Sequence, residues 1–499
     1  MKKAILLLCL PLLISCGGGN SDEEVEVLSP IIEKALNNTT SKFYADFASF
    51  PNERAPLPIG VFDSGTGGLT VLEVLLSIDK MNNITGEEGS DGVLDFAGED
   101  FSYFADRANM PYGLYASKNK EHFFKELVVK DALFMLDDKF YQNVEEEIPQ
   151  GVKKSSKIVV IACNTATAYG LKEIDTLLTK SNTGVKVIGV INAGVKALFN
   201  KLSSERGAKD ERDSIAVGVM ATIGTISSGA YEREIFRCAK ESGYLGYLKV
   251  VNQPGAGFAE AVDGEKEYVN SELKELSDSY KGPIVGVSEN DIDISSLEAY
   301  NFDFTNNGVL VQRGYRGKIE KLQLNSAANY ARFHLVSIFE KLRKSGVKVP
   351  LKYVILGCTH YPYLLDVLNE TIAHLKDYES DGVYIYRDLI DKDFSFIDPA
   401  MYTAIECYKT LRADKQLAFR TREGRVDAYI SVPAYNLSKE LLDGSYNLSS
   451  DFKYGRELNT EDITTVQVPF TRENIGDEVL ERISKQLPYS YSKIKNTIE

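Results

Sequence analysis

Residues 157–168 read KIVVIACNTATA, an apolar run that ends in Cys163 and continues into small polar residues. The stretch KYVILGCTHYPYLL at 352–365 repeats this order, with Cys358 in the place of the first cysteine. Both runs are apolar throughout instead of alternating, which is typical of strands buried on both faces of a parallel sheet. The residues after each cysteine can begin a helix, so the sequence predicts two strand–cysteine–helix units in one chain.

The rest of the chain alternates between strand-like and helix-like segments. Further strand-like runs lie at 57–62, 101–105, 185–191, 214–220, 247–251 and 383–386. Helix-like segments lie at 69–80, 113–140, 166–180, 193–204, 228–242, 322–345 and 362–376. This alternation predicts an α/β fold with mainly parallel sheets flanked by crossover helices. Residues 262–320 and 409–499 have no clear period, and we expect insertions or added surface structure there.

The composition is that of a globular protein, and it excludes several classes of function. Apolar residues make up 43% of the 499 residues and charged residues 26%, enough for a substantial core. The net charge of −15 argues against nucleic acid or an anionic membrane surface as the main partner. Neither a CxxC nor an HExxH motif occurs in the sequence, so a metal site has no support from it.

The N-terminus has the pattern of an export signal. A short basic start at 1–3 precedes an apolar run at 4–14 that is too short to span a membrane. The following Leu13-Ile14-Ser15-Cys16 resembles the lipobox of bacterial lipoproteins, in which the cysteine is lipidated. The alternative is an ordinary signal peptide that happens to contain Cys16.

The expected location is the cell envelope, with the chain anchored to the membrane through a lipid on Cys16. Gly17, rather than an aspartate, follows that cysteine, which favours the outer membrane, on its periplasmic or its surface-exposed side. The acidic run at 21–24 is either a surface-export signal or a solvated linker. We expect a signal peptide at 1–15, a lipidated tether at 16–56 and a folded body that begins near Leu57.

The stretch IGVFDSGTGGLTVLEVLL at 59–76 predicts a strand, a glycine turn and a helix. Glycines let backbone N–H groups approach an anion at the start of a helix. No lysine follows Gly68, so the turn is not a GxxxxGK[ST] phosphate loop. Asp63 stands at the carboxyl end of the strand, the side on which parallel sheets place ligands. It therefore either takes part in a site or only caps the turn.

The two cysteines share a setting that favours chemistry. Each stands at a strand end beside a predicted helix N-terminus, which lowers the pKa of a thiol from its usual value of about 8.5. His360, which follows closely after Cys358, can relay a proton. A single buried cysteine is more often a core residue, as we expect for Cys238 and Cys407, but the repeated pattern favours a function.

Two thiols at matched strand ends can face each other across a cleft. One thiolate then removes a proton from a carbon acid, while the opposite thiol returns a proton to the other face. Such a site needs no cofactor if it stabilises the carbanion electrostatically. The sequence therefore predicts a cofactor-independent racemase.

The chain resembles the cofactor-independent glutamate racemases of the aspartate/glutamate racemase superfamily. The stretches that carry the resemblance are DSGTGGLTVL (63–72), YFADRANMPYG (103–113), ACNTATA (162–168), VIGVINAG (187–194), VMATIGTISSGAY (219–231) and LGCTHYPYLL (356–365). The resemblance implies a small amino-acid substrate and acid/base roles for the thiols of Cys163 and Cys358. Their supporting groups would be Asp63, His360 and Glu260. The residues expected to hold the substrate are Asp63, Ser64, Tyr112, Gly113, Asn164, Thr165, Thr222 and Thr359.

The resemblance also implies two similar lobes around a cleft, with large insertions. We expect the first lobe to hold residues 57–188 and 380–499. The second lobe is expected to hold 189–379, with an insertion at 262–320. The chain departs from the family's usual residues at 192–194 and 252–257, and both changes bear on the shape of the pocket.

Several functions stay open at this point. The first is racemisation of glutamate by an exported, lipid-anchored enzyme, with aspartate as the alternative substrate. Hydantoin racemisation and maleate isomerisation also occur in the superfamily, but the DSGTGGLTVL and CTHYP stretches favour glutamate. A non-catalytic amino-acid-binding lipoprotein is favoured by the changed segments and the insertions. An exported thiol enzyme would meet an oxidising compartment, where a cleft could shield its thiols. A homodimer is compatible with the sequence.

Overall fold

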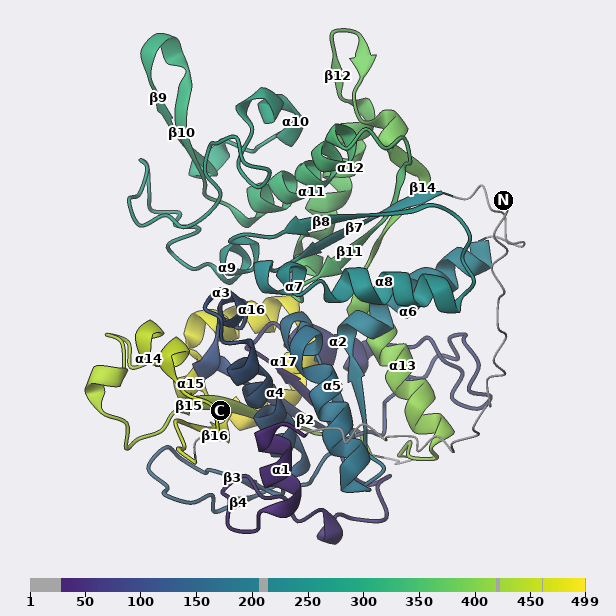
Figure 1. Cartoon of the computed structure of the whole chain (residues 1–499), viewed down its shortest axis with the longest axis vertical. Coiled ribbons are helices and arrows are strands. Elements are labelled where there is room, and N and C mark those ends of the chain that lie inside the picture. Colours follow the sequence, from purple (N-terminus) through teal and green to yellow (C-terminus); the bar gives the residue numbers. More distant parts are fainter. Residues whose placement is uncertain (1–27, 206–213, 419–421, 460, 499) are drawn as a thin grey trace, which may run out of the picture.

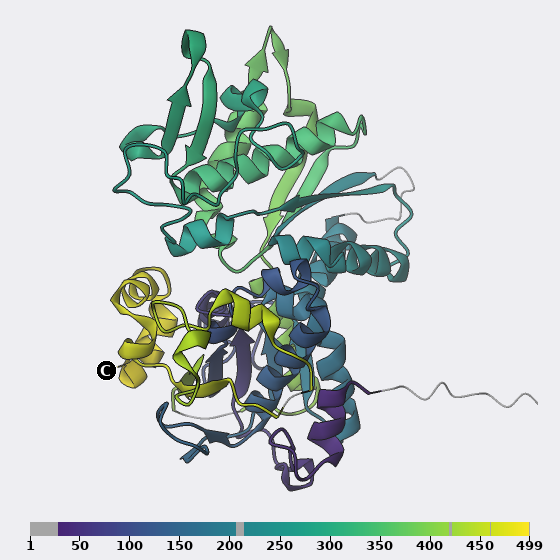
Figure 2. The same ribbon diagram turned by 60° about the vertical axis from the view of Figure 1, so that its left-hand side comes forward.

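The structure, a computed structural model, describes residues 28–205, 214–418, 422–459 and 461–498. Figures 1 and 2 show two lobes stacked along the long axis, each with a sheet and helices packed around it. The C-terminal segment lies in the same lobe as the first strands of the chain, and the middle of the chain forms the other lobe. The predicted α/β class with mainly parallel sheets is confirmed. The expected signal peptide and Cys16 lie outside the described residues.

The first lobe holds a six-stranded sheet. Its order is β16 (Thr465–Pro469), β15 (Val426–Pro433), β2 (Phe101–Ala105), β1 (Ile59–Asp63), β5 (Ile158–Ile161) and β6 (Lys186–Gly189). All neighbouring strands are parallel except β15 and β16. Every residue of β1, β2 and β5 is buried, as expected for apolar strands that are covered on both faces.

The second lobe holds a four-stranded parallel sheet. Its order is β14 (Ile390–Ile397), β11 (Leu351–Gly357), β7 (Ile215–Ala221) and β8 (Leu248–Pro254). Because β14 pairs with β11, the chain still belongs to the second sheet beyond residue 380. It returns to the first lobe after β14, through α13 (Pro399–Ala413), which packs on α2 (Leu69–Ser77) and α6 (Val190–Glu205). The lobe boundary expected at 380 is therefore too early.

The remaining helices and short strands surround these sheets. The helices are α1 (Pro30–Asn37), α3 (Gly113–Ser117), α4 (Glu121–Leu136), α5 (Asn164–Ser181), α7 (Ile223–Ser227), α8 (Ala230–Glu241), α9 (Phe258–Asp263), α10 (Leu297–Tyr300), α11 (Ala327–Lys344), α12 (Leu365–Asp377), α14 (Ser450–Gly455), α15 (Arg472–Ile475), α16 (Asp477–Gln486) and α17 (Pro488–Ile498). Two-stranded hairpins are β3 (Lys139–Phe140) with β4 (Gly151–Val152), β9 (Val309–Arg313) with β10 (Ile319–Leu324), and β12 (Glu379–Ser380) with β13 (Val383–Tyr384). Within the described part of the chain, no helix is both long and apolar enough to cross a bilayer.

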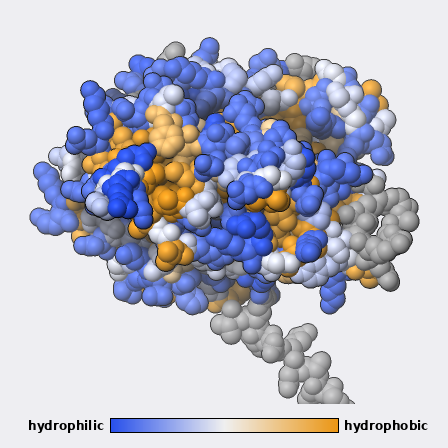
Figure 3. All heavy atoms as spheres, turned by 90° about the horizontal axis from the view of Figure 1, so that it is seen from above, coloured by the Kyte–Doolittle hydropathy of each residue, from blue (hydrophilic) through white to orange (hydrophobic). Residues whose placement is uncertain are grey.

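One segment differs from the expected organisation, and a second forms a projecting hairpin where an insertion was expected. α1 packs on α4 and α5 with Ile31 and Ile32 buried, so part of the expected tether belongs to the folded body. The insertion at 262–320 contains the β9–β10 hairpin, which projects from the second lobe (Figure 1). Figure 3 looks onto that end of the molecule and shows hydrophilic side chains with apolar groups between them.

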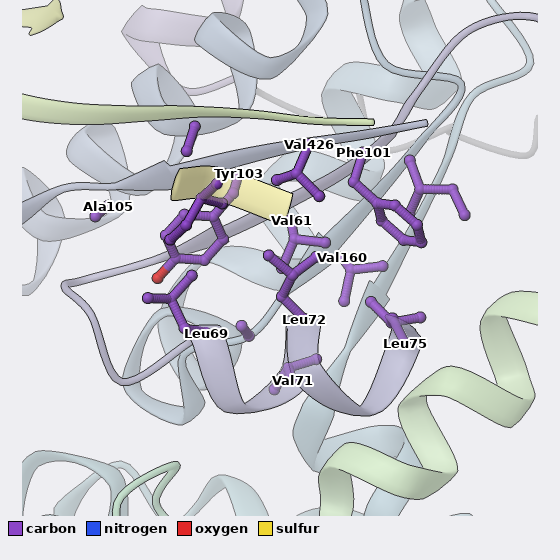
Figure 4. Close-up of a cluster of buried hydrophobic side chains, with 14 of the residues drawn as sticks. Val61, Leu69, Val71, Leu72, Leu75, Phe101, Tyr103, Ala105, Val160 and Val426 are labelled. Atoms are coloured by element: carbon purple, nitrogen blue, oxygen red, sulfur yellow. The ribbon is translucent and has the colours of Figure 1, made fainter. Parts of the chain in front are cut away.

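A core in the first lobe fixes the loop after β1. Val61, Phe101 and Val160 come from three neighbouring strands and meet Leu72 and Leu75 of α2, as Figure 4 shows. All five side chains are buried. Burial of one such side chain contributes about 1.5–3 kcal/mol, so this layer anchors α2. The glycine turn at 64–68 is thereby held at the carboxyl edge of the sheet.

Candidate active site

Asp63 ends β1 and lies buried under the glycine turn. Its Oδ2 accepts hydrogen bonds from the backbone N–H groups of Gly65 (3.1 Å) and Gly68 (2.8 Å). A Cβ on Gly68 would lie 2.3 Å from the Cβ of Asp63, so only glycine fits there. Burial raises the pKa of Asp63, while the hydrogen bond from Gly68 and the charge of His360 oppose that rise. Asp63 therefore closes the turn and also lies within reach of a charge on the second lobe.

Cys163 follows β5 and caps the N-terminus of α5. Its Sγ accepts a hydrogen bond from the N–H of Ala166 at 3.4 Å and lies 3.8 Å from the Oγ of Ser64. Burial, and then the charge of Asp63, raise the pKa of this thiol. The expectation that the helix N-terminus lowers it is therefore wrong for Cys163, because loss of solvent outweighs the hydrogen bonds. Cys163 is held as a protonated thiol.

Cys358 follows β11 at the corresponding edge of the second sheet. Its Sγ lies 3.4 Å from the Nδ1 of His360. The Nε2 of His360 lies 3.1 Å from the Oδ2 of Asp263, at the end of α9. Burial opposes the charged imidazole, but the charges of Asp263 and Cys358 hold the pKa of His360 well above its usual value. The charged imidazolium is therefore the favoured form of His360, and its Nδ1 faces the sulfur of Cys358.

Asp263, rather than the expected Glu260, is the carboxylate next to His360. Glu260 lies one turn earlier on α9, and burial raises the pKa of its carboxyl. Burial also opposes the ionisation of Asp263, but His360 and then Arg482 outweigh it and hold its pKa below the usual value. The supporting role beside His360 is thus corrected to Asp263. The sequence does not show which carboxylate of the short helix reaches a histidine almost a hundred residues away.

The structure brings the two predicted thiols to the junction between the lobes. Burial is the main cause that raises the pKa of Cys163, and the charge of Cys358 is a smaller one, so the second sulfur lies within electrostatic reach of the first. Cys163 is carried by β5 of the first sheet and Cys358 by β11 of the second. Each sulfur has its own polar partner, the Ser64 hydroxyl at Cys163 and the His360 imidazole at Cys358.

Polar side chains from both lobes meet around the thiols. The Oγ1 of Thr165 lies 3.2 Å from that of Thr222 and 3.1 Å from that of Thr225. The hydroxyl of Tyr231 donates to the Oδ1 of Asn164 at 2.6 Å. These contacts join α5 of the first lobe to α7 and α8 of the second. They supply neutral hydrogen-bonding groups, which suit the carboxylates and ammonium group of an amino acid.

The site is closed in this structure. A cavity of about 10 Å³ adjoins Cys358, and Asn164, Thr359 and Asp398 are among the residues that line it. This volume holds about one water molecule, so binding of an amino acid requires the two lobes to separate. Cys163 and Asp63 do not line this cavity, and Cys163 and Cys358 are both buried.

Tyr112 and Gly113 lie at the junction between the lobes, but their contacts differ from the substrate contacts that the sequence predicts. The hydroxyl of Tyr112 lies 2.6 Å from the Oδ2 of Asp106 and 2.7 Å from the Oδ2 of Asp131. It is thus engaged by buried carboxyl groups, and a ligand would meet the backbone of Tyr112 rather than its hydroxyl. Gly113 packs directly against Gly224 of the second lobe.

Five residues of the site are missing from the sequence prediction: Thr225, Tyr231, Asp263, Asp398 and Arg482. The stretch VMATIGTISSGAY contains the first two, and Thr222 caps the short helix that carries Thr225. That capping pattern is a local signal from which Thr225 follows. Asp398 caps α13, a second local signal of the same kind. For Arg482 the sequence holds no such signal, since it lies in the region without a clear period.

The chain is similar to proteins named glutamate racemase, although no family model matches it. It is 30% identical over 185 residues to the glutamate racemase of Aquifex aeolicus, which covers 37% of this chain and 52% of that protein. It is 23% identical over 384 residues to that of Carboxydothermus hydrogenoformans, covering 76% and 88%. The first match spans about half the length of the curated relative, so the activity of this chain is inferred from its own site.

Solved structures of similar proteins carry the same name. A glutamate racemase isoform from Bacillus anthracis aligns with a TM-score of 0.40 and 22% identity, covering 74% of this chain and 87% of that chain. The glutamate racemase of Francisella tularensis in complex with D-glutamate aligns with a TM-score of 0.37 and 20% identity, covering 81% and 96%. At these scores, the assignment of the fold depends on the sheet topology described above.

Proposed function

We propose that this chain is a cofactor-independent racemase that interconverts L- and D-glutamate, with Cys163 and Cys358 as its two acid/base groups. The observation that carries the proposal is the pair of thiols at the lobe junction, one beside Ser64 and the other beside His360. The names of the relatives favour glutamate as the substrate. Racemisation of aspartate, and binding of an amino acid without turnover, are the alternatives.

The two thiols differ in a way that suits a first turnover. Burial raises the pKa of the Cys163 thiol, whereas Cys358 has the imidazole of His360 3.4 Å from its sulfur. The Cys358 thiolate takes the proton from Cα of one enantiomer, and the C–H electron pair passes into the adjacent carboxylate. The S–H of Cys163 then gives its proton to the opposite face of Cα and is left as a thiolate. The protons balance within one turnover, which leaves Cys358 as the thiol and Cys163 as the thiolate. Before the next molecule of the same enantiomer reacts, Cys358 loses its proton to solvent and Cys163 takes one up.

Neutral donors near the thiols would stabilise the carbanion. The hydroxyls of Thr165 and Thr222 now contact each other at 3.2 Å and can turn to a substrate carboxylate when the lobes open. Hydrogen bonds of this kind are strongest in a site that excludes water. Closure of the lobes around a bound substrate would provide that condition.

The proposal includes export and lipid anchoring at Cys16, with the outer membrane as the destination. The basic start, the short apolar run and the Leu-Ile-Ser-Cys ending at 13–16 support it. Cys163 and Cys358 are only 7% and 6% exposed, which would protect both thiols from an oxidising compartment. Growth of a bacterial host with labelled palmitate would test the anchor: the chain should take up label, and Cys16→Ser should not.

Deuterium exchange separates racemisation from its alternatives. The purified chain, kept reduced in D₂O, should convert L-glutamate to D-glutamate with deuterium at Cα. Cys163→Ser and Cys358→Ser should each abolish conversion, whereas Cys407→Ser, a buried cysteine in the core cluster of the first lobe, should keep it. Binding of glutamate without exchange would support the binding protein, and faster conversion of aspartate would move the assignment to that substrate.

A further inference from the structure

The C-terminal segment places one arginine against both lobes at the site. In α16, the Nη1 of Arg482 lies 2.6 Å from the Oδ1 of Asp263 in the second lobe. Its Nη2 donates a hydrogen bond to the Oγ1 of Thr66, in the glycine turn of the first lobe, at 3.1 Å. The side chains of Arg482 and Asp263 are 19% and 18% exposed, so this pair is largely shielded from water.

A continuous series of contacts therefore runs from Cys358 to α16. The distances are 3.4 Å from Cys358 to His360, 3.1 Å from His360 to Asp263 and 2.6 Å from Asp263 to Arg482. The two oxygens of Asp263 are divided, with Oδ2 next to His360 and Oδ1 next to Arg482. Both contacts of Asp263 are ion pairs by distance, and each uses a different carboxylate oxygen.

α16 is firmly attached to the first lobe. Leu480, Ile483 and Leu487 are buried in the same core cluster that holds β1 and α2. The carboxylate of Glu73 in α2 accepts hydrogen bonds from the backbone N–H groups at 489 and 490, where α17 begins. Arg482 consequently reaches Asp263 of the second lobe from a fixed platform on the first lobe.

We propose that Arg482 is a positioning residue: from the first lobe it holds Asp263 in the place where that carboxylate supports His360 beside Cys358. The inference rests on the proposed racemase function, and it assigns a role to the C-terminal segment. Arg482 touches neither sulfur. It acts through Asp263, so its contribution is present in the closed state and lost when the lobes separate.

Other charged and titratable groups act on this pair, and they limit the expected effect. The groups that interact electrostatically with His360 or Asp263 are Asp63, Arg107, Glu260, Glu265, Cys358, Tyr363 and Arg482. The charge of Arg107 also interacts with Asp263, so loss of Arg482 leaves part of the positive potential in place. We therefore expect a clear loss of rate rather than an inactive protein.

The first test compares two neutralised cations on the same helix. Arg482→Gln should lower kcat about ten-fold with KM nearly unchanged, because it disturbs a group that supports the acid/base thiol. Lys485→Gln is the control, since the ion pair that Lys485 forms among the described residues is with Glu481, and the two side chains are 69% and 67% exposed. It should leave kcat unchanged. Arg482→Lys should recover most of the lost rate by restoring the charge. A rise in KM alone, or equal losses in both Gln variants, would overturn the proposal.

The second test asks whether Arg482 acts through Asp263. If it does, Arg482→Gln should cause no further loss of kcat in an Asp263→Asn background, although each change alone lowers kcat. A role in folding alone would instead give losses that multiply. Independent losses in the double variant would therefore refute the positioning role even if both single variants are slow.

The third test does not depend on turnover and so separates this inference from the proposed function. With four histidines in the chain, the ring resonances of His360 can be assigned by comparison with His360→Gln. They should shift in Arg482→Gln and stay in place in Lys485→Gln. If the wild-type chain fails to racemise glutamate, the proposed function fails, and these resonances alone decide whether Arg482 influences His360. Resonances that do not move in Arg482→Gln would end the inference.

Discussion

The contact between Gly113 of α3 and Gly224 of α7 offers a direct test of lobe closure. A Cβ on Gly224 would lie 2.7 Å from the Cα of Gly113 and 2.9 Å from its carbonyl oxygen. Ordinary contacts of a Cβ begin near 3.4 Å. Both obstacles are backbone atoms that cannot rotate away, so Gly224→Ala must push α3 and α7 apart by roughly 0.7 Å or more. Overpacking of this kind costs about 1–3 kcal/mol of the free energy of unfolding.

The same displacement bears on catalysis, because the two helices belong to different lobes. Separation at this point pulls Thr222 and the second lobe away from Thr165 and Cys163. A misplacement of about 1 Å can lower a rate by up to about 100-fold. We therefore expect Gly224→Ala to lower kcat for racemisation ten- to 100-fold, on the order of that limit.

Urea unfolding and the change in optical rotation of L-glutamate would measure the two effects. Gly113→Ala is the control for stability, since its Cβ would lie 3.7 Å from the nearest atom, the backbone N of Gly224. It should change the free energy of unfolding by less than about 1 kcal/mol. If Gly224→Ala keeps both its stability and its kcat, the lobes do not close as tightly as described here, and the reasoning fails.

Three further changes test the buried polar groups. Burial lowers the pKa of His334 to about 3, below the unfolded value of 6.5, so the unfolded chain binds the proton first and stability should fall as pH drops from 6.5 toward 3. Urea unfolding at pH 7 and pH 4.5 should show a loss of about 2.5 kcal/mol from this group, absent in His334→Gln. Burial raises the pKa of Asp131 well above its usual value, so stability falls as pH rises, and Asp131→Asn should be more stable than wild type at pH 8; a less stable variant would contradict this. Tyr231→Phe removes the hydrogen bond to Asn164 and should cost about 1–3 kcal/mol by thermal or urea unfolding, whereas no change would show that this bond does not hold the lobes.

The sequence predicts the central strands of both sheets well because they are continuous apolar runs. The runs that became β1, β5, β7 and β11 are buried at every position. The edges are harder to predict. β14, for example, carries exposed lysine and aspartate in its first half and is buried mainly at its ends. A single strand such as β15, inside a long segment without a period, gives no alternation with helices from which to infer it.

The residues of the candidate site also fall into those that the sequence predicts and those that it does not. Cys163, Asp63, Cys358 and His360 can be predicted because each stands next to a strand that the sequence reveals. Asp263 and Arg482 cannot, since their importance comes from tertiary contacts between segments that are far apart in the chain. The direction of the Cys163 pKa shift fails for a related reason: a sequence shows a helix N-terminus but not how completely the sulfur is removed from water.

The closed cavity of about 10 Å³ has a consequence for isotopes. The S–H hydrogen of either cysteine can exchange with solvent only while the lobes are separated. While the lobes stay closed, the hydrogen removed from Cα therefore remains on the sulfur that removed it. The product receives a different hydrogen, which the opposite sulfur took from solvent before the lobes closed. In D₂O, the first D-glutamate formed from L-glutamate should be deuterated at Cα, while the L-glutamate recovered at that moment still carries protium. Equal labelling of both from the outset would mean that water reaches the sulfurs while the ligand is enclosed.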